Sequence, residues 1–269
     1  MIREPKPVKW FLRLFAIGYV GLLVVLPVFV VVQRTLAPGW PAIVEALSSP
    51  EVVHGLRLTA VATFWSVLCN LIFGVGVSLL LVRYEFRGKR ALSVLLDLPL
   101  SVSPVVVGLA LMLVYTKDAP VGRFLYGIGY QIIFATPGIV LATTFVALPL
   151  VIREVVPVLT EIGDDQEVAA KSLGASGVQT FWRITLPAIK WAVVYGVVLT
   201  LARSLGEFGA VKVVSGNISL QTQTATLVVQ DTYQNFQPQT AYTVSLLLTL
   251  AAVICITVVT LLRPKETES

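Results

Sequence analysis

The chain has 269 residues, of which 56% are hydrophobic and only 13% are charged, and its mean hydropathy is +0.85. These values exclude an ordinary soluble domain and are typical of a protein that crosses a membrane several times. The net charge of +5 does not indicate a nucleic-acid-binding protein, because the basic residues are scattered between apolar runs and form no patch.

Six apolar segments are each long enough to cross a bilayer, whose hydrocarbon core of about 30 Å needs roughly 20 helical residues. They are residues 14–34, 58–82, 93–116, 134–156, 188–210 and 240–262. The first has 19 uncharged residues, Leu14 to Val32, which is longer than a signal-peptide core, and no small-residue cleavage site follows before Gln33. We therefore predict an all-α membrane protein with six transmembrane helices, the first of them retained.

Lysine and arginine predict the orientation of these spans. With the N-terminus inside, 14 of the 20 basic residues fall on the inner side: Arg3, Lys6, Lys9, Arg13, Arg83, Arg87, Lys89, Arg90, Arg153, Lys171, Arg183, Lys190, Arg263 and Lys265. Because basic residues concentrate in cytoplasmic loops, we expect cytoplasmic ends at 1–13 and 263–269, flanking a single membrane domain over 14–262. The connection 159–187 is then cytoplasmic, and the polar loop 212–239 lies outside.

Span three contains two prolines in the text LDLPLSVSPVVVG, Pro99 and Pro104, with Ser101 and Ser103 beside them. Proline removes a backbone donor and kinks a helix, and the freed carbonyls need partners in protein or water. Two interpretations stay open: an ordinary kink between packed helices, or a helix that lines an aqueous path.

The cytoplasmic connection has the signals of two short helices. Asp164 and Glu167 have the spacing of a capping box at a helix start. Gly174 suits the left-handed position that follows a helix end. Ser176 and Gln179 form a second capping-box pair. We therefore predict two short helices joined at the sequence Gly-Ala-Ser.

An apolar stripe accompanies these signals. Leu159, Ile162, Ala169 and Leu173 recur at spacings of three, four or seven residues. Pro187 suits the first turn of the next span. The stripe must be covered by the bilayer surface or by a partner. Its mixture of charges and its few basic residues favour a partner over lipid.

The text QEVAAKSLGASGVQTFWRITLP resembles the cytoplasmic signature of ABC-importer permeases: Glu-Ala-Ala, three residues, Gly, nine residues, Ile, one residue, Leu-Pro. The residues that match at the required spacings are Ala169, Ala170, Gly174, Ile184, Leu186 and Pro187. The chain departs from the signature at Val168, since its acidic residue, Glu167, stands one position earlier. In the family this element is the coupling helix, which inserts into a cleft on the ATPase subunit. The resemblance assigns ATPase coupling to Glu167, Ala169, Ala170, Leu173, Gly174, Ala175 and Ser176.

Two further stretches narrow the resemblance. DLPLSVSPVVVG at 97–108 and ARSLGEFGAVKVVSGNI at 202–218 are similar to the W-type permease subunit of sulfate/thiosulfate importers, and related molybdate permeases share ARxxGEFGA-like text. The resemblance implies the type I ABC importer permease fold in the inner or plasma membrane of a prokaryote. It also implies ATP-driven import of sulfate, and of thiosulfate, by alternating access, with molybdate or tungstate as the alternative cargo.

The resemblance implies partners as well. These are a related T-type permease in a heterodimer, two copies of an ABC ATPase that carry ATP and Mg, and an extracytoplasmic sulfate-binding protein. The sequence alone does not distinguish a heterodimer from a homodimer. The loop 212–239 is our candidate for part of the dock for the binding protein.

The fifth span carries an arginine and a glutamate four residues apart, Arg203 and Glu207, which can form an ion pair on one helix face. The pair either pins the helix near the outer surface or presents positive potential to an anion path. Small residues recur along the same span at Ala188, Ala192, Gly196, Thr200 and Ser204, a spacing that lets helices approach closely. The candidate residues for the translocation path or its gate are Ser101, Ser103, Pro104, Arg203, Ser204 and Glu207.

The sequence contains no GxxxxGK[ST] motif, so we expect no ATP hydrolysis by this chain and no cofactor bound to it. With one histidine, it offers no candidate metal site. A secondary transporter driven by an ion gradient is the alternative of another class, and it would need a midplane carboxylate and inverted repeats. A membrane-embedded enzyme would need a nucleophile and a base, which we do not find.

Overall fold

The structure is a computed structural model that describes residues 6–262, and the side chains of residues 10–261. Every regular element in this range is a helix. In chain order they are α1 (Lys6–Val20), a π-helical turn η1 (Gly21–Val25), α2 (Leu26–Leu36), α3 (Trp40–Ser48), α4 (Pro50–Arg83), α5 (Lys89–Ser101), α6 (Pro104–Tyr115), α7 (Pro120–Gly127), α8 (Thr136–Ile162), α9 (Asp165–Ser172), α10 (Gly177–Thr180), a π-helical turn η2 (Phe181–Thr185), α11 (Leu186–Leu205), α12 (Gly209–Ser215), α13 (Ala225–Gln234) and α14 (Pro238–Leu262).

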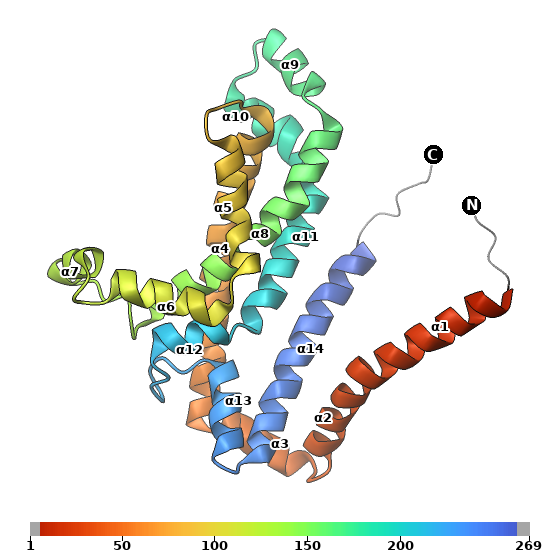
Figure 1. The fold of residues 1–269 in the computed structure, drawn as a ribbon, viewed down its shortest axis with the longest axis vertical. Helices are drawn as coiled ribbons and strands as arrows, with labels where there is room; N and C mark the ends of the chain where they lie inside the picture. Colours follow the sequence, from red (N-terminus) through yellow and green to blue (C-terminus); the bar gives the residue numbers. More distant parts are fainter. Residues whose placement is uncertain (1–5, 263–269) are drawn as a thin grey trace.

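Within the described range, five helices are long and apolar enough to cross a membrane, and a bent pair of helices raises the number to six. The five are Trp10–Leu36, Pro50–Arg83, Thr136–Ile162, Gly177–Leu205 and Pro238–Leu261. Figure 1 shows α9 and α10 at one end of the molecule and α3 and α13 at the other. The connection 159–187 and the segment 212–239 therefore lie at opposite ends of the molecule, which agrees with the prediction that they lie on opposite sides of the membrane.

Three helices, α4, α8 and α11, form the centre of the bundle (Figure 1). They meet at Val151 of α8, which is fully buried. A Cβ atom added to Gly74 of α4 would lie 2.8 Å from the Val151 side chain, and one added to Gly196 of α11 would lie 2.9 Å from the Val151 Cα atom. The small-residue row of span five therefore faces α8, because only glycine lets the helices approach this closely.

The close approach at Gly74 gives a direct test of this packing. We expect Gly74→Ala to lower stability by about 1–3 kcal/mol, because the added methyl group must displace a buried, stiff valine. Gly76→Ala is the matched control, two residues along the same helix, where no heavy atom lies within 4 Å of the added Cβ. Thermal unfolding of the two detergent-solubilised variants measures the difference. Equal melting temperatures would contradict the packing described here.

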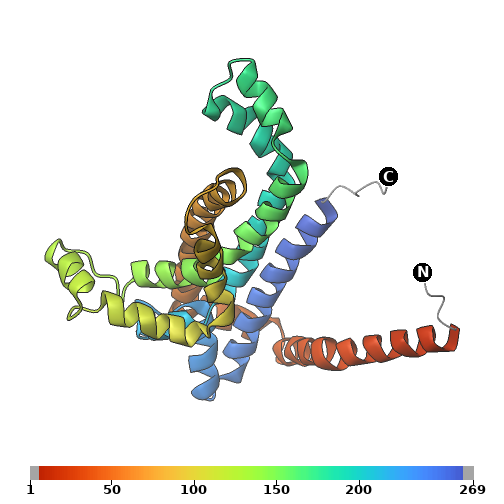
Figure 2. The ribbon, with the colours of Figure 1, turned by 45° about the horizontal axis from the view of Figure 1, so that its top comes forward.

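Most of the N-terminal helix stands away from this bundle, and only its C-terminal part, in α2, packs on α14. Residues Trp10–Leu36 form one long apolar helix, and the 18-residue window that qualifies it as a span has no buried residue. Figure 2 shows the helix reaching sideways from the bundle. Large apolar side chains such as Phe15, Leu22 and Phe29 are more than 60% exposed. A surface of this kind requires lipid or another subunit to cover it.

Span three is not one helix over residues 93–116, as the sequence analysis predicts, but two helices, α5 and α6, bent by 114°. Val102 and Ser103 between them are extended, with ψ angles of 138° and 135°. Proline pushes the preceding residue out of the helical region, and Pro104 also removes the donor that the Leu100 carbonyl would need. Pro99 does not break the helix.

Span five ends at Leu205, five residues earlier than predicted, and the chain turns through Gly206–Phe208 into α12. At this break the Glu207 carboxylate accepts a 3.0 Å hydrogen bond from the Ala210 N–H group, which satisfies one of the free backbone donors at the start of α12. The segment 212–239 is likewise not an open loop, since it contains α13. A Cβ atom added to Gly55 of α4 would lie 2.8 Å from the Val228 side chain, so α13 packs tightly on the bundle.

Candidate functional site

The joint at the end of α9 has the conformation that the sequence predicts. Gly174 has a φ angle of +85°, which side chains with a Cβ atom rarely adopt. Its N–H group donates to the Lys171 carbonyl at 3.0 Å, and the Ala175 N–H group donates to the Ala170 carbonyl at 3.0 Å. These two bonds form a Schellman motif, which satisfies the last carbonyls of α9 and fixes where the chain leaves the helix.

The second predicted capping box is also confirmed. The Gln179 N–H group donates to the Ser176 hydroxyl at 3.3 Å, and the Ser176 N–H group donates to the Gln179 side chain at 2.9 Å. The helix that follows is not a separate short helix, as predicted, because α10 continues through η2 into α11 as one helix over Gly177–Leu205. Pro187 lies in the first turn of α11. The segment after Ser176 is therefore the N-terminal extension of the helix of span five.

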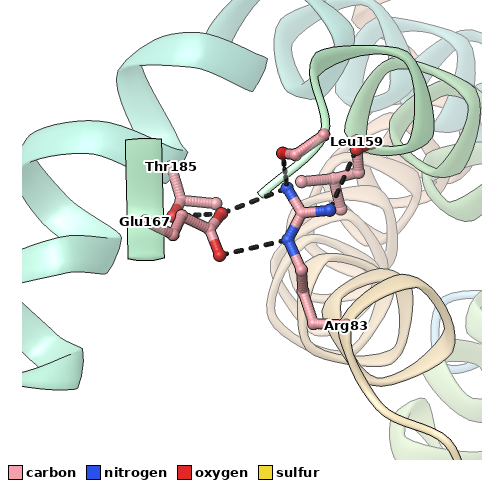
Figure 3. A network of polar contacts seen from close by, with 5 residues as sticks. Arg83, Leu159, Glu167 and Thr185 are labelled. Carbon is pink, nitrogen blue, oxygen red and sulfur yellow. Dashed lines mark hydrogen bonds and ion pairs between the residues drawn. The ribbon is translucent and has the colours of Figure 1, made fainter. Parts of the chain in front are cut away.

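The first predicted capping box is wrong. Asp164 makes no capping hydrogen bond with its side chain. The Glu167 carboxylate faces the bundle, where it binds Arg83, the last residue of α4 (Figure 3). A carboxylate in a partly buried site gains more from a guanidinium than from one backbone N–H group, and this preference explains why the local motif does not form.

Arg83 is the centre of this network (Figure 3). Its Nε and Nη2 atoms donate to the two Glu167 oxygens, each at 3.1 Å. Nη1 donates to the Leu159 carbonyl at 3.1 Å, and Nη2 donates to the Gly163 carbonyl at 2.7 Å. The Thr185 hydroxyl donates to Glu167 Oε1 at 2.9 Å. Both charged side chains are 13% exposed.

The network fastens four elements to one another: the end of α4, the last turn of α8, α9 and the turn η2. Arg83 caps α8, whose last carbonyls have no partner within the helix. The planar guanidinium suits this role because its donors point in fixed directions toward several acceptors at once. The sequence predicts for Arg83 only a place among the basic residues of the inner side. The signal that could have found its role in the network is an arginine at the end of an apolar span together with several acidic residues, Glu161, Asp164, Asp165 and Glu167, in the connecting segment.

The tip of the predicted coupling segment is apolar and exposed. Leu173 is 90% exposed, and Val168, Val178 and Trp182 are also exposed. Among the residues assigned to ATPase coupling, Ala169, Leu173, Gly174 and Ser176 are exposed, Ala170 and Ala175 are half-buried, and Glu167 points inward. The segment thus has two sides: a polar side fastened to α4 and α8, and an apolar side open to a partner.

The predicted ion pair of the fifth span is present. Arg203 Nη1 lies 2.7 Å from Glu207 Oε2, and the glutamate side chain is almost fully buried while the arginine side chain is 37% exposed. The Glu207 carbonyl accepts a hydrogen bond from the Thr226 hydroxyl at 2.8 Å. Glu207 therefore connects the end of α11, the start of α12 and α13.

The structure brings part of the predicted path together. A Cβ atom added to Gly209 would lie 3.1 Å from Pro104 Cβ, so the bend of span three touches the break after α11. Ser101 and Ser103 are exposed at that bend. Ser204 is buried, and its hydroxyl has no hydrogen-bond partner among the described residues. The two breaks in the membrane helices thus lie side by side.

Comparisons with known proteins agree with this architecture. The sequence model of the family described as "Binding-protein-dependent transport system inner membrane component" matches residues 70–264. The chain is 46% identical over 247 residues to the sulfate transport system permease protein CysW of Synechococcus elongatus, covering 90% of this chain and 86% of that protein. It is 34% identical over 218 residues to the sulfate transport system permease protein CysT of Salmonella typhimurium, covering 81% of this chain and 79% of that protein.

A solved structure shows the same fold. The chain superposes with a TM-score of 0.79 on a chain of a bacterial alginate ABC transporter in complex with an alginate pentasaccharide-bound periplasmic protein, covering 97% of this chain and 96% of that one at 15% identity. The predicted all-α permease fold is confirmed, with the corrections to spans three and five given above. The chain therefore belongs to the family of binding-protein-dependent transport system inner membrane components, the multi-pass membrane subunits of ABC importers.

Proposed function

We propose that the chain is the W-type membrane subunit of an ATP-driven sulfate importer. The observation that carries this proposal is the coupling segment, which combines an exposed apolar tip with an arginine network that holds it to α4 and α8. The cargo rests on the relatives: identity is 46% to a CysW protein and 34% to a CysT protein. The higher identity favours the W-type subunit.

The partners follow from the surfaces that the chain leaves uncovered. The exposed tip at Leu173 fits a cleft on an ABC ATPase, two copies of which would carry ATP and Mg. The exposed apolar N-terminal helix fits lipid and a second permease subunit, for which a T-type chain is our proposal. An extracytoplasmic sulfate-binding protein would dock at the opposite end, near α13. We place the complex in the inner membrane of a prokaryote.

The mechanism is alternating access. Closure of the two ATPases on ATP would move both coupling segments, and the Arg83 network would pass this motion to α4, α8 and α11 as rigid helices. The breaks at Pro104 and Gly206 supply the irregular backbone that occurs in membranes only where protein or water satisfies it. Low affinity for the anion inside the membrane suits this scheme, since a tightly bound ion would leave slowly.

Uptake of radiolabelled sulfate by cells that lack only this chain tests the proposal. We expect uptake to be lost, restored by the gene, and competed by unlabelled thiosulfate but not by molybdate. Loss of molybdate uptake with intact sulfate uptake would keep the importer architecture and overturn the cargo. Uptake that follows an ion gradient and persists without a partner ATPase would overturn the importer itself.

A further inference from the structure

Helix α5 has three distinct faces. Its buried face, with Leu96 and Pro99, packs on α4 and α8. A second face is apolar and exposed; Leu95, for example, is 59% exposed. The third face is polar, and its residues recur at spacings of three or four: Arg90, Ser93, Asp97 and Ser101. A helix that faced only lipid and its own bundle would not need this third face.

An ion pair joins the polar face to α8. Arg153 Nε and Nη2 donate to Asp97 Oδ1 at 3.2 and 2.9 Å. The pair lies at the edge of an apolar cluster that contains Leu96 and Ile152, the neighbours of the two charged residues. Unlike the Arg83–Glu167 pair, it is open, since the two side chains are 57% and 54% exposed.

The Asp97–Arg153 pair lies within two predicted membrane spans, so its exposure indicates what surrounds this part of the protein. Asp97 lies four residues inside the apolar segment 93–116 and Arg153 three residues inside the segment 134–156, or about 5–6 Å from their cytoplasmic ends at 1.5 Å per residue. Asp97 has apolar neighbours on both sides in the sequence, whereas Arg153 follows Ile152 and precedes Glu154, which is half-buried on another side of α8. Charged groups at such depth face water or protein rather than lipid, because hydrocarbon does not solvate them. An open pair here therefore borders an aqueous space or a neighbouring subunit.

The course of the polar face along α5 indicates which of the two, water or a neighbouring subunit, this face borders. It runs from the cytoplasmic end of α5 to the bend at Ser101, where α5 stops and α6 turns away (Figure 1). At the bend, Pro104 leaves the Leu100 carbonyl without its helical donor, and Leu100 is 44% exposed. Contacts between membrane helices use small residues and uncharged polar side chains such as serine, so the open ion pair, rather than the hydroxyls, favours water on this face.

We propose that this face of α5 lines the cytoplasmic half of the translocation path, and that Arg153, with Asp97 as its resting partner, is the anion contact there. The ligand class is a tetrahedral oxyanion, and the assignment rests on the importer function proposed above. A guanidinium offers several donors to such an anion. Asp97 keeps the site neutral when it is empty and competes with the anion, which limits how tightly the anion is held.

Cysteine labelling tests the aqueous path along α5 without using sulfate. In the assembled complex, with Cys69 and Cys255 replaced by alanine, Ser93→Cys or Ser101→Cys is exposed to thiosulfonate reagents in inside-out vesicles. We expect rapid reaction, and a preference for a sulfonate-bearing over a trimethylammonium-bearing reagent of roughly tenfold, the scale of electrostatic focusing in a cleft. Leu95→Cys, on the exposed apolar face of the same helix, is the matched control and should not react.

Two further outcomes decide the role of Arg153. Adding Arg153→Gln to Ser93→Cys should abolish the preference for the anionic reagent while labelling continues. If Ser93→Cys stays as unreactive as Leu95→Cys with and without nucleotide, the face is covered by protein or lipid and the proposal fails. If labelling is fast but indifferent to reagent charge, Arg153 is not the anion contact. Neither result depends on the cargo, so sulfate uptake can fail independently of this test.

Discussion

We expect Arg83→Gln to uncouple ATP hydrolysis from sulfate uptake. The variant removes the donors that hold Glu167 and the carbonyls of Leu159 and Gly163, and so it leaves a partly buried carboxylate without its counter-ion. Loss of one partner of a buried ion pair costs about 3–5 kcal/mol, and the 13% exposure of these side chains places the cost toward the lower end. Uptake and ATPase activity, measured together in reconstituted vesicles with the binding protein, should separate: uptake falls at least several-fold and hydrolysis continues.

Two control variants separate the effect of the Arg83 charge from the effect of its planar geometry and from a nonspecific loss of stability. Arg83→Lys keeps the charge but replaces the planar fork by a point charge, so we expect a partial loss of uptake. Lys89→Gln removes a basic residue at the same end of the molecule. Its ion-pair partner Glu85 is 88% exposed and Lys89 is half-buried, and surface pairs of this kind contribute about 0–1 kcal/mol. If uptake and hydrolysis fall in the same proportion in Arg83→Gln, the network stabilises the fold but does not transmit motion.

The parts of the coupling segment that sequence predicts well are those set by one or two neighbouring residues. Gly174 adopts its left-handed conformation, and the Ser176 capping box forms, because backbone preference and a side chain three residues away decide both. The spans follow in the same way from length and apolar composition. These features need no knowledge of how distant segments meet.

The features that sequence misses depend on distant partners. Glu167 has the spacing of a local cap, yet it pairs with Arg83, which is 84 residues away in the chain. The break after Ser101 was expected only as a kink, because proline predicts that a helix is disturbed but not by what angle. At the 114° bend Pro104 packs against Gly209 of α12, which is separated from α6 in the chain by the five helices α7 to α11.

At the break after α11, we expect Arg203→Gln to lower stability strongly, Glu207→Gln to lower it less, and the double variant to recover it. Arg203→Gln leaves the almost fully buried Glu207 charge uncompensated, at about 3–5 kcal/mol, whereas Glu207→Gln leaves an arginine that is 37% exposed and reaches water. Glutamine at position 207 still offers an oxygen to the Ala210 N–H group, so α12 keeps its cap. The unmodified protein, the two single variants and the double variant form a double-mutant cycle. Their thermal unfolding in detergent measures the coupling between the side chains of Arg203 and Glu207.

Sulfate uptake by the same four proteins decides what the pair does. Because Glu207 is almost fully buried and joins α11, α12 and α13, we expect uptake to return with stability in the double variant, as for a pair that pins the helices. Lys212→Gln is the control, since Lys212 lies over the Phe208 ring and its loss should change stability by no more than about 0.5 kcal/mol. If the double variant is stable but its sulfate uptake stays low, Arg203 belongs to the anion path instead. In that case transport needs the arginine charge although the stability of the fold does not.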